Sequence, residues 1–149
     1  MENEHRNLES VNMTRKEKYP ETLVFHYHQA NPFNKINGDC VVRAVSVFLG
    51  ITWEQCIREM TECGLKKGLI INDPENIKNY LESKGIKKKP MPRREDRTRY
   101  TAVEFCKELA QDHKRYLLSL ANHVTVVVNQ KVWDIWDCTK KSVGNYWEN

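Results

Sequence analysis

Apolar positions recur along this chain with a helical spacing in its first two thirds and a strand-like spacing in its last third. The longest apolar run, CVVRAVSVFL, extends from Cys40 to Leu49. Asn37 or Asp39 before the run is suited to cap a helix, and Gly50 after it is suited to end one. The run therefore predicts a buried helix over these ten residues.

Three further helices are predicted from the residues that begin and end them. The sequences TWEQ and TAVE each have the pattern of a capping box, in which a threonine and an acid or amide three positions later satisfy each other's backbone groups. The sequence DP places a capping residue before a proline at the first helical position. Glycines end two of these helices. The predicted ranges are 52–64, 73–85 and 101 to about 112.

After residue 112 the pattern changes to short runs of β-branched and aromatic residues, which predict strands. The sequence TLVFHYH predicts an earlier strand over 22–28. The runs on either side of Asn129-Gln130 are expected to pair as a hairpin. The later strands are predicted at 115–120, 124–128, 131–136 and 143–147.

Helices followed by antiparallel strands are typical of the α+β class. The chain has 149 residues, of which 40% are hydrophobic and 30% charged, and this balance excludes collagen-like, low-complexity and membrane-spanning classes. We expect a single domain over 21–149. Residues 1–20 are polar and without periodicity, and we expect them to form a mobile arm.

The N-terminus has no apolar leader, and no window of about 18 apolar residues occurs, so we expect a cytoplasmic protein without a membrane partner. Thiols stay reduced in that compartment, and we interpret the five cysteines as free. Their spacing includes no close pair of the kind that holds zinc. We therefore expect no metal and no cofactor.

The net charge of +4 is concentrated in one segment. Residues 84–99 contain eight lysines and arginines against two acids. Pro90 and Pro92 make this segment extended, and it is remote in sequence from the residues discussed next. It is a candidate surface for a substrate or partner, through Lys87, Lys88, Lys89, Arg93 and Arg94. Nucleic acid is not the favoured partner, because Tyr100 is the only nearby aromatic residue for stacking.

Cys40 is the first candidate for chemistry, because it lies in the first turn of its predicted helix, after Gly38-Asp39. Unpaired N–H groups and the helix dipole favour a thiolate there, and the same groups can stabilise an oxyanion. The alternative is a small apolar residue in a core helix. The other four cysteines are interpreted as structural: Cys56, Cys63, Cys106 and Cys138.

His123 is the second candidate, because it begins the buried strand of the predicted hairpin. A histidine base needs an acceptor behind its second nitrogen, and the returning strand offers Asp134 and Asp137. A three-residue loop would place His123 opposite Asp137. A two-residue loop would place it opposite Trp136, with Asp134 diagonal on the same face. We prefer Asp137, because a direct pair needs less reach. Trp133 and Trp136 are expected either to shield the pair from water or to pack on the hairpin, and Trp136 is also a candidate for the substrate or partner surface.

The order of cysteine, histidine and acid resembles the papain-like cysteine protease superfamily. The segment NGDCVVRAV resembles the nucleophile motif of ovarian-tumour-type deubiquitinases, with Asp and Asn exchanged around the glycine. The segments HVTVV and DIWD resemble bacteriocin-processing peptidases and other compact bacterial or phage-borne members. DIW also resembles the Asn-x-Trp of papain-type enzymes, which favours Asp134. Asn34 stands where the family has its oxyanion glutamine.

This resemblance implies a papain-like fold, in which an N-terminal helical half carries the nucleophile helix and packs on a C-terminal antiparallel sheet. It implies a cysteine hydrolase that cleaves a peptide, isopeptide or other amide in a protein or peptide substrate. The alternative is a catalytically weak or inactive module on the same scaffold. Such a module would be encoded by a mobile element and would inhibit a protein partner, or it would bind nucleic acid through residues 84–99.

Overall fold

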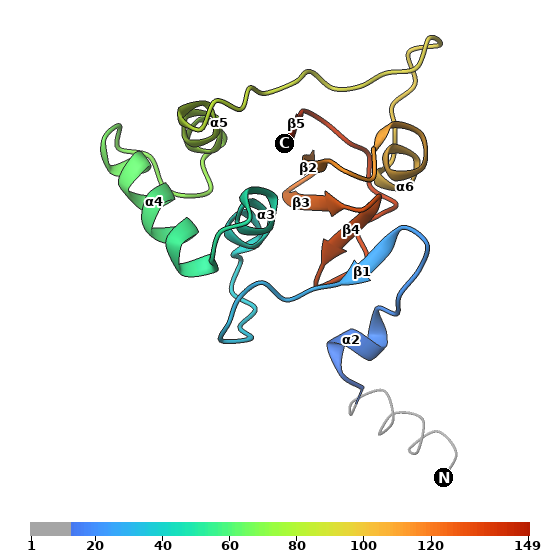
Figure 1. Cartoon of the computed structure of the whole chain (residues 1–149), viewed down its shortest axis with the longest axis horizontal. Coiled ribbons are helices and arrows are strands. Elements are labelled where there is room, and N and C mark those ends of the chain that lie inside the picture. Colours follow the sequence, from blue (N-terminus) through green and yellow to red (C-terminus); the bar gives the residue numbers. More distant parts are fainter. Residues whose placement is uncertain (1–12) are drawn as a thin grey trace.

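A five-stranded sheet lies at the centre of the computed structural model, which describes residues 13–149 (Figure 1). The strand order is β1-β4-β3-β2-β5. β1 runs parallel to β4, and the other neighbours are antiparallel. The strands are β1 (Phe25–Tyr27), β2 (Arg115–Leu120), β3 (His123–Val128), β4 (Lys131–Asp134) and β5 (Tyr146–Glu148).

The α+β class is confirmed, but the expectation of an all-antiparallel C-terminal sheet is wrong at β1. This strand comes from the N-terminal part of the chain and joins the edge of the sheet in parallel. A parallel pair needs a long crossover, and the helices between residues 40 and 109 lie in the chain between β1 and β4.

Helices cover both faces of the sheet. Figure 1 shows α3, α4 and α5 on one side and α6 on the other. The helices are α2 (Arg15–Lys18), α3 (Cys40–Leu49), α4 (Trp53–Leu65), α5 (Pro74–Ser83) and α6 (Ala102–Glu104), which continues into a π-helical turn (Phe105–Leu109). The predicted helix at 40–49 is confirmed at both ends, and the fourth helix is shorter than expected. Its final turn widens because the Ala110 N–H bonds to the Phe105 carbonyl, five residues back.

Alternation along β3 separates two apolar clusters. Val126 faces the cluster that contains Val45 and Phe48 of α3, whereas Val127 faces the cluster that contains Phe25 and Phe105. Residues Val45, Phe48 and Phe25 are completely buried. The apolar stripe of α3 is thereby fixed against β3, which sets the height of its first turn relative to the sheet.

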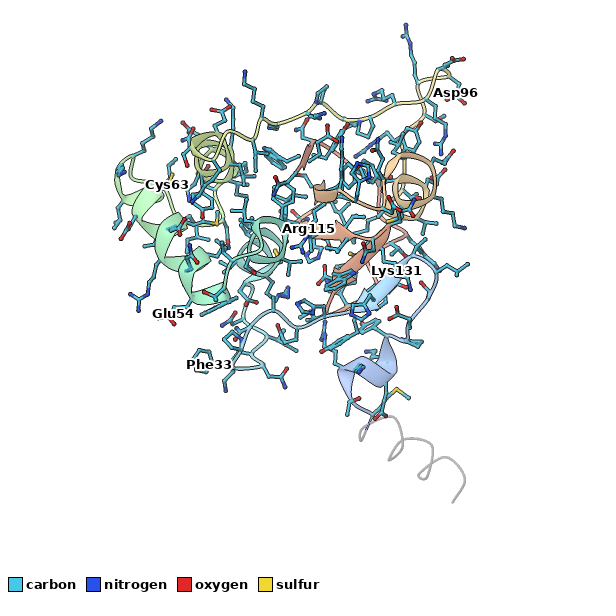
Figure 2. The ribbon with its side chains drawn as sticks, in the orientation of Figure 1. Phe33, Glu54, Cys63, Asp96, Arg115 and Lys131 are labelled. Atoms are coloured by element: carbon cyan, nitrogen blue, oxygen red, sulfur yellow. The ribbon has the colours of Figure 1, made fainter. Side chains whose placement is uncertain are left out.

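The predicted arm is only partly covered by the structure, because residues 1–12 lie outside the described part. In α2, Arg15 donates to the Ile135 carbonyl at 2.6 Å, which ties the end of the arm to the domain. The basic segment crosses the end of the sheet, where Lys89 forms an antiparallel bridge with Tyr146. Figure 2 shows Asp96 at a projecting turn of that segment.

Within residues 13–149, no single helix is both long and apolar enough to cross a membrane. The α3 and α4 helices together meet that length and composition, but their axes are bent by 109°.

Candidate active site

The start of α3 is fixed by the carboxylate of Asp39. This N-cap side chain makes no capping hydrogen bond to its own helix. Its Oδ2 instead accepts from Asn31 Nδ2 at 3.1 Å and from Trp53 Nε1 at 3.0 Å. Its Oδ1 lies 3.2 Å from Arg43 Nε, in an ion pair that is almost completely buried. Gly38 before it has a φ of 75°, a conformation that favours glycine.

This network positions Cys40, the residue that follows. Cys40 is half-buried and borders a cavity of about 630 Å³ that His123 also borders. The first hydrogen bond of α3 runs from the Arg43 N–H to the Asp39 carbonyl. The N–H groups of Cys40 and Val41 precede that bond and are therefore available to an oxyanion.

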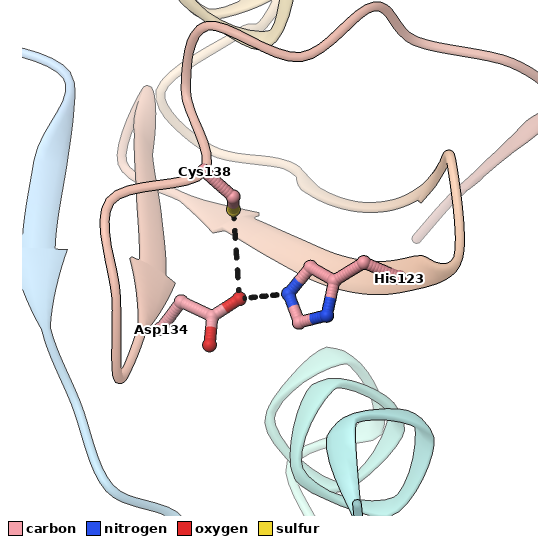
Figure 3. A group of neighbouring side chains, drawn as sticks. All are labelled: His123, Asp134 and Cys138. Atoms are coloured by element: carbon pink, nitrogen blue, oxygen red, sulfur yellow. Dashed lines mark hydrogen bonds and ion pairs between the residues drawn. The ribbon is translucent and has the colours of Figure 1, made fainter.

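His123 and Asp134 meet at one end of the sheet. In an antiparallel pair the start of β3 lies beside the end of β4, and these residues occupy those two positions. His123 Nε2 lies 2.6 Å from Asp134 Oδ2, and both side chains are more than 90% buried. Figure 3 shows this pair, with the second ring nitrogen turned toward α3. The arrangement places an imidazole between a carboxylate and the helix that begins with Cys40.

The choice of Asp137 as the partner of His123 is wrong. Val128 pairs with Lys131, so the hairpin loop has two residues rather than three. Asp134 is therefore on the face of His123 and bonds to it, and it is the acid that DIW favoured. The carboxylate of Asp137 accepts the N–H and hydroxyl of Thr139 instead.

Trp136 lies beside the imidazole, as the two-residue loop requires. Its ring centroid is 5.0 Å from that of His123, with the planes inclined by 58°. The indole therefore covers one side of the imidazole and helps to exclude water from its bond to Asp134.

Asp134 is held by more than its histidine. Its Oδ2 also accepts from Thr125 Oγ1 at 2.7 Å and from the Cys138 thiol at 3.6 Å, and its Oδ1 accepts the Ile135 N–H at 2.7 Å. Burial and the charge of Asp134 raise the pKa of the Cys138 thiol, which keeps its proton available to donate. Sequence reasoning missed Thr125 and assigned Cys138 to structure. The directly opposite position of Thr125 in the two-residue register was the signal that could have found it.

The pKa values of Cys40 and His123 are shifted in the directions that favour a thiolate and an imidazolium. Burial works to raise the pKa of the Cys40 thiol, but the His123 imidazole, the Val124 N–H and the charge of Arg43 outweigh it, and the pKa is lowered. Burial also works to lower the pKa of His123. Its contacts with Asp134, Cys138 and Cys40 outweigh that effect and raise the pKa well above its usual value. A thiolate and an imidazolium are thereby favoured together.

Asn34 lies apart from this group. It is exposed, its backbone has a φ of 52°, and its N–H bonds to the Asn31 carbonyl. It does not border the cavity that Cys40 and His123 share. The predicted oxyanion role of Asn34 therefore has no support in this arrangement, and the first-turn amides of α3 are the better donors.

His123, Asp134 and Cys138 are the one trio of potential metal ligands that come together within residues 13–149. Two ligands in a tetrahedral zinc site, each about 2.0 Å from the ion, would lie roughly 3.3 Å apart. The 2.6 Å between His123 Nε2 and Asp134 Oδ2 is a hydrogen-bond length. The trio therefore fits an oriented imidazole better than a metal.

Within residues 13–149, some side chains of the basic segment have a carboxylate or carbonyl partner and others have none. Lys89 pairs with Glu148. Arg94 pairs with Glu104 and Glu108, and its guanidinium lies 4.1 Å from the centroid of the Tyr100 ring. Arg93 donates to the Arg97 carbonyl, Lys87 is exposed, and Lys88 borders the cavity.

Three of the remaining cysteines lie outside the group formed by Cys40, His123, Asp134 and Cys138. Cys56 and Cys106 are buried, and burial raises the pKa of each thiol to about 12. Cys63 is half-buried and packs against the core beside α3. Cys40 is thus set apart by its lowered pKa.

Comparison with known proteins gives no match: no family model, no curated protein and no solved structure corresponds to this chain at a significant level.

Proposed function

We propose that this protein is a cysteine hydrolase that cleaves an amide bond in a protein or peptide, with Cys40 as nucleophile, His123 as general acid and base, and Asp134 as orienting carboxylate. The observation that carries the proposal is the buried 2.6 Å contact of His123 with Asp134, on a ring that shares a cavity with Cys40. A histidine fixed in this way has its second nitrogen free to serve a thiol.

The reaction follows from these positions. The Cys40 thiolate attacks the substrate carbonyl carbon, and the carbonyl oxygen becomes an oxyanion that the N–H groups of Cys40 and Val41 stabilise. The imidazolium of His123 gives its proton to the leaving amine as the carbon–nitrogen bond breaks. A thioester remains on Cys40. His123 then takes a proton from water as that water attacks the thioester, and the carbon–sulfur bond breaks to release the acid and restore the Cys40 thiolate beside the His123 imidazolium.

The resemblance to compact papain-like proteases supports the same proposal. The sequence motifs around Cys40 and His123 carry that resemblance, and the nucleophile at the start of a helix that packs on a sheet is compatible with it. We propose the papain-like superfamily as the family of this chain on these grounds. Peptide, isopeptide and side-chain amide bonds all fit the chemistry.

Alkylation of Cys40 tests the proposal without a known substrate. We expect iodoacetamide to modify Cys40 rapidly at pH 6–7 in the wild-type protein, followed as the Cys40-containing peptide by mass spectrometry. In His123→Ala the rate should rise only near pH 8.5, as for a free thiol. The matched control is His113→Ala, which removes an exposed histidine that does not border the cavity.

Identical pH curves for wild type and His123→Ala, both centred near 8.5, would overturn the proposal. They would favour the alternative of a binding module, in which Cys40 is a packing residue. The salt bridges of Lys89 and Arg94 reduce the charge that such a module could offer to a nucleic-acid backbone.

A further inference from the structure

The wall of the cavity beside Cys40 holds one cation whose charge is not balanced within the site, Lys88. His123 can also be cationic, but Asp134 and the Cys40 thiolate balance its charge. Among residues 13–149, no aspartate or glutamate borders the cavity. Asp73 is adjacent in sequence to residues of the wall, but its carboxylate accepts the Glu75 N–H at the start of α5. A substrate that reaches Cys40 therefore meets one cation, Lys88, that has no acidic partner among the described residues.

Lys88 reaches the cavity because the basic segment is extended at this point. Lys89 exchanges backbone hydrogen bonds with Tyr146, and its side chain pairs with Glu148. Successive side chains of an extended chain point to opposite sides, so Lys88 points away from the Glu148 pair. Lys88 forms no ion pair within residues 13–149, in contrast to Lys89 and Arg94.

The rest of the wall is mixed. Ile77 and Trp147 supply apolar surface, and Asn72 and Asn145 supply neutral hydrogen-bonding groups. A free ammonium at the edge of such a wall attracts an anion more strongly than it would in open water, because part of the solvent is displaced. Carboxylates are the anions that proteins and peptides carry.

We propose that this cavity receives a substrate with a carboxylate close to the bond that is cleaved, and that Lys88 is the residue that selects it. This inference rests on the proposed hydrolase function, since it names the substrate class of the same site. Lys88 is exposed, so its contribution is a modest discrimination, of roughly two- to fivefold at low salt, that weakens as salt is added.

The charge of the cavity can be measured by comparing two alkylating reagents of similar size. Iodoacetate is an anion and iodoacetamide is neutral, and each forms a carbon–sulfur bond to the Cys40 thiolate as iodide leaves. The ratio of their rates at Cys40 reports the local charge. We expect Lys88→Gln to lower the ratio by roughly two- to fivefold and Lys88→Glu to lower it further.

The matched control is Lys87→Glu, which makes the same change in net charge at an exposed neighbour that does not border the cavity. It should leave the ratio nearly unchanged. Equal effects of Lys87→Glu and Lys88→Glu, or no effect of either, would overturn the inference.

The source of the carboxylate is distinguished by chloroacetyl probes, which alkylate a thiol as chloride leaves. Three probes are compared: chloroacetyl-glutamate amide, chloroacetyl-glutamine amide, and chloroacetyl-glutamine with a free terminal carboxylate. Faster reaction of the first probe identifies an acidic side chain as the source of the substrate carboxylate. Faster reaction of the third probe identifies a C-terminal carboxylate as that source. A Lys88-dependent gain with either supports the inference, and equal rates for all three contradict it.

Failure of this inference and failure of the proposed function give different results. The hydrolase proposal fails if the pH curve for Cys40 alkylation does not depend on His123. The inference fails if that curve is as expected but the reagent ratio does not depend on Lys88.

Discussion

At the scale of single residues, Asp134 is the most constrained group in the site. Its two oxygens accept four hydrogen bonds, from His123, Thr125, Cys138 and the Ile135 backbone. Donors on both of its oxygens hold this carboxylate in one orientation. The imidazole of His123 takes its own orientation from the 2.6 Å contact between its Nε2 and Asp134 Oδ2.

Asp134→Asn and Asp137→Asn form a matched pair that tests this role. Both changes replace a carboxylate by an amide of the same size, three positions apart. We expect Asp134→Asn to lower the rate of Cys40 alkylation at pH 6–7 and to lower hydrolysis by about 10²–10⁴-fold, because the amide favours the wrong tautomer. Asp137→Asn should stay close to wild type, since in the described part of the chain its carboxylate bonds to Thr139 and not to His123. A larger loss in Asp137→Asn would contradict the assignment.

At the scale of elements, the start of α3 depends on residues from two other segments. Asn31 belongs to the loop after β1, and Trp53 begins α4, yet both donate to Asp39. The ion pair with Arg43 completes the set one turn further along α3. The first turn is thus held from outside the helix, which keeps its amides free of side-chain caps.

Trp53→Phe removes one of these donors while keeping an aromatic ring. We expect the free energy of unfolding to fall by about 1–3 kcal/mol, because the Asp39 carboxylate loses a partner in a buried position. The rate of Cys40 alkylation should fall with it, as the first turn becomes less fixed. Trp133→Phe is the control for the loss of an indole elsewhere, since that ring packs against His26 and His28. Unchanged stability and alkylation in Trp53→Phe would show that Asp39 does not depend on this bond.

At the scale of the whole molecule, one strand pairing assembles both halves of the site. The His28 N–H, just after β1, donates to the Asp134 carbonyl at 2.9 Å. The chain then passes through the loop that contains Asn31 and enters α3 at Cys40. The position of the nucleophile relative to the His123–Asp134 pair is therefore set by the parallel edge strand, which connects regions more than 100 residues apart.

The ion pair of Cys40 and His123 gives a distinctive pH dependence of global stability. A raised histidine pKa contributes stability that is lost as pH rises above the unfolded value of about 6.5. A lowered cysteine pKa contributes stability that is lost as pH falls below the unfolded value near 8.5. Between these values the two slopes have opposite signs, and in the wild-type protein they offset each other.

Cys40→Ala should remove the contribution of the cysteine to the pH dependence of stability, so that only the contribution of His123 remains. We expect its free energy of unfolding, measured by urea at pH 7.0–8.5, to fall relative to wild type by up to about 1.4 kcal/mol per pH unit. The control is Cys63→Ala, whose difference from wild type should not vary with pH. A constant difference between Cys40→Ala and wild type across this range would show that the pair does not exchange a proton.

The local sequence determined several features by itself. The capping residues and apolar runs predicted the helices, and the confirmed bounds of α3 place Cys40 in its first turn. The β-branched run placed His123 at the start of β3. These features depend on contacts between near neighbours in the chain, which a sequence pattern reports directly.

Only the tertiary structure decided the rest. The choice of Asp134 over Asp137 depended on a loop that is one residue shorter, and such a shift exchanges the two faces of a strand. Asn31 donates to Asp39, and Lys88 borders the cavity of Cys40 and His123; both contacts bring together residues that are distant in sequence. Local propensities carry no information about such long-range contacts, because these contacts are set by how the helices pack on the sheet.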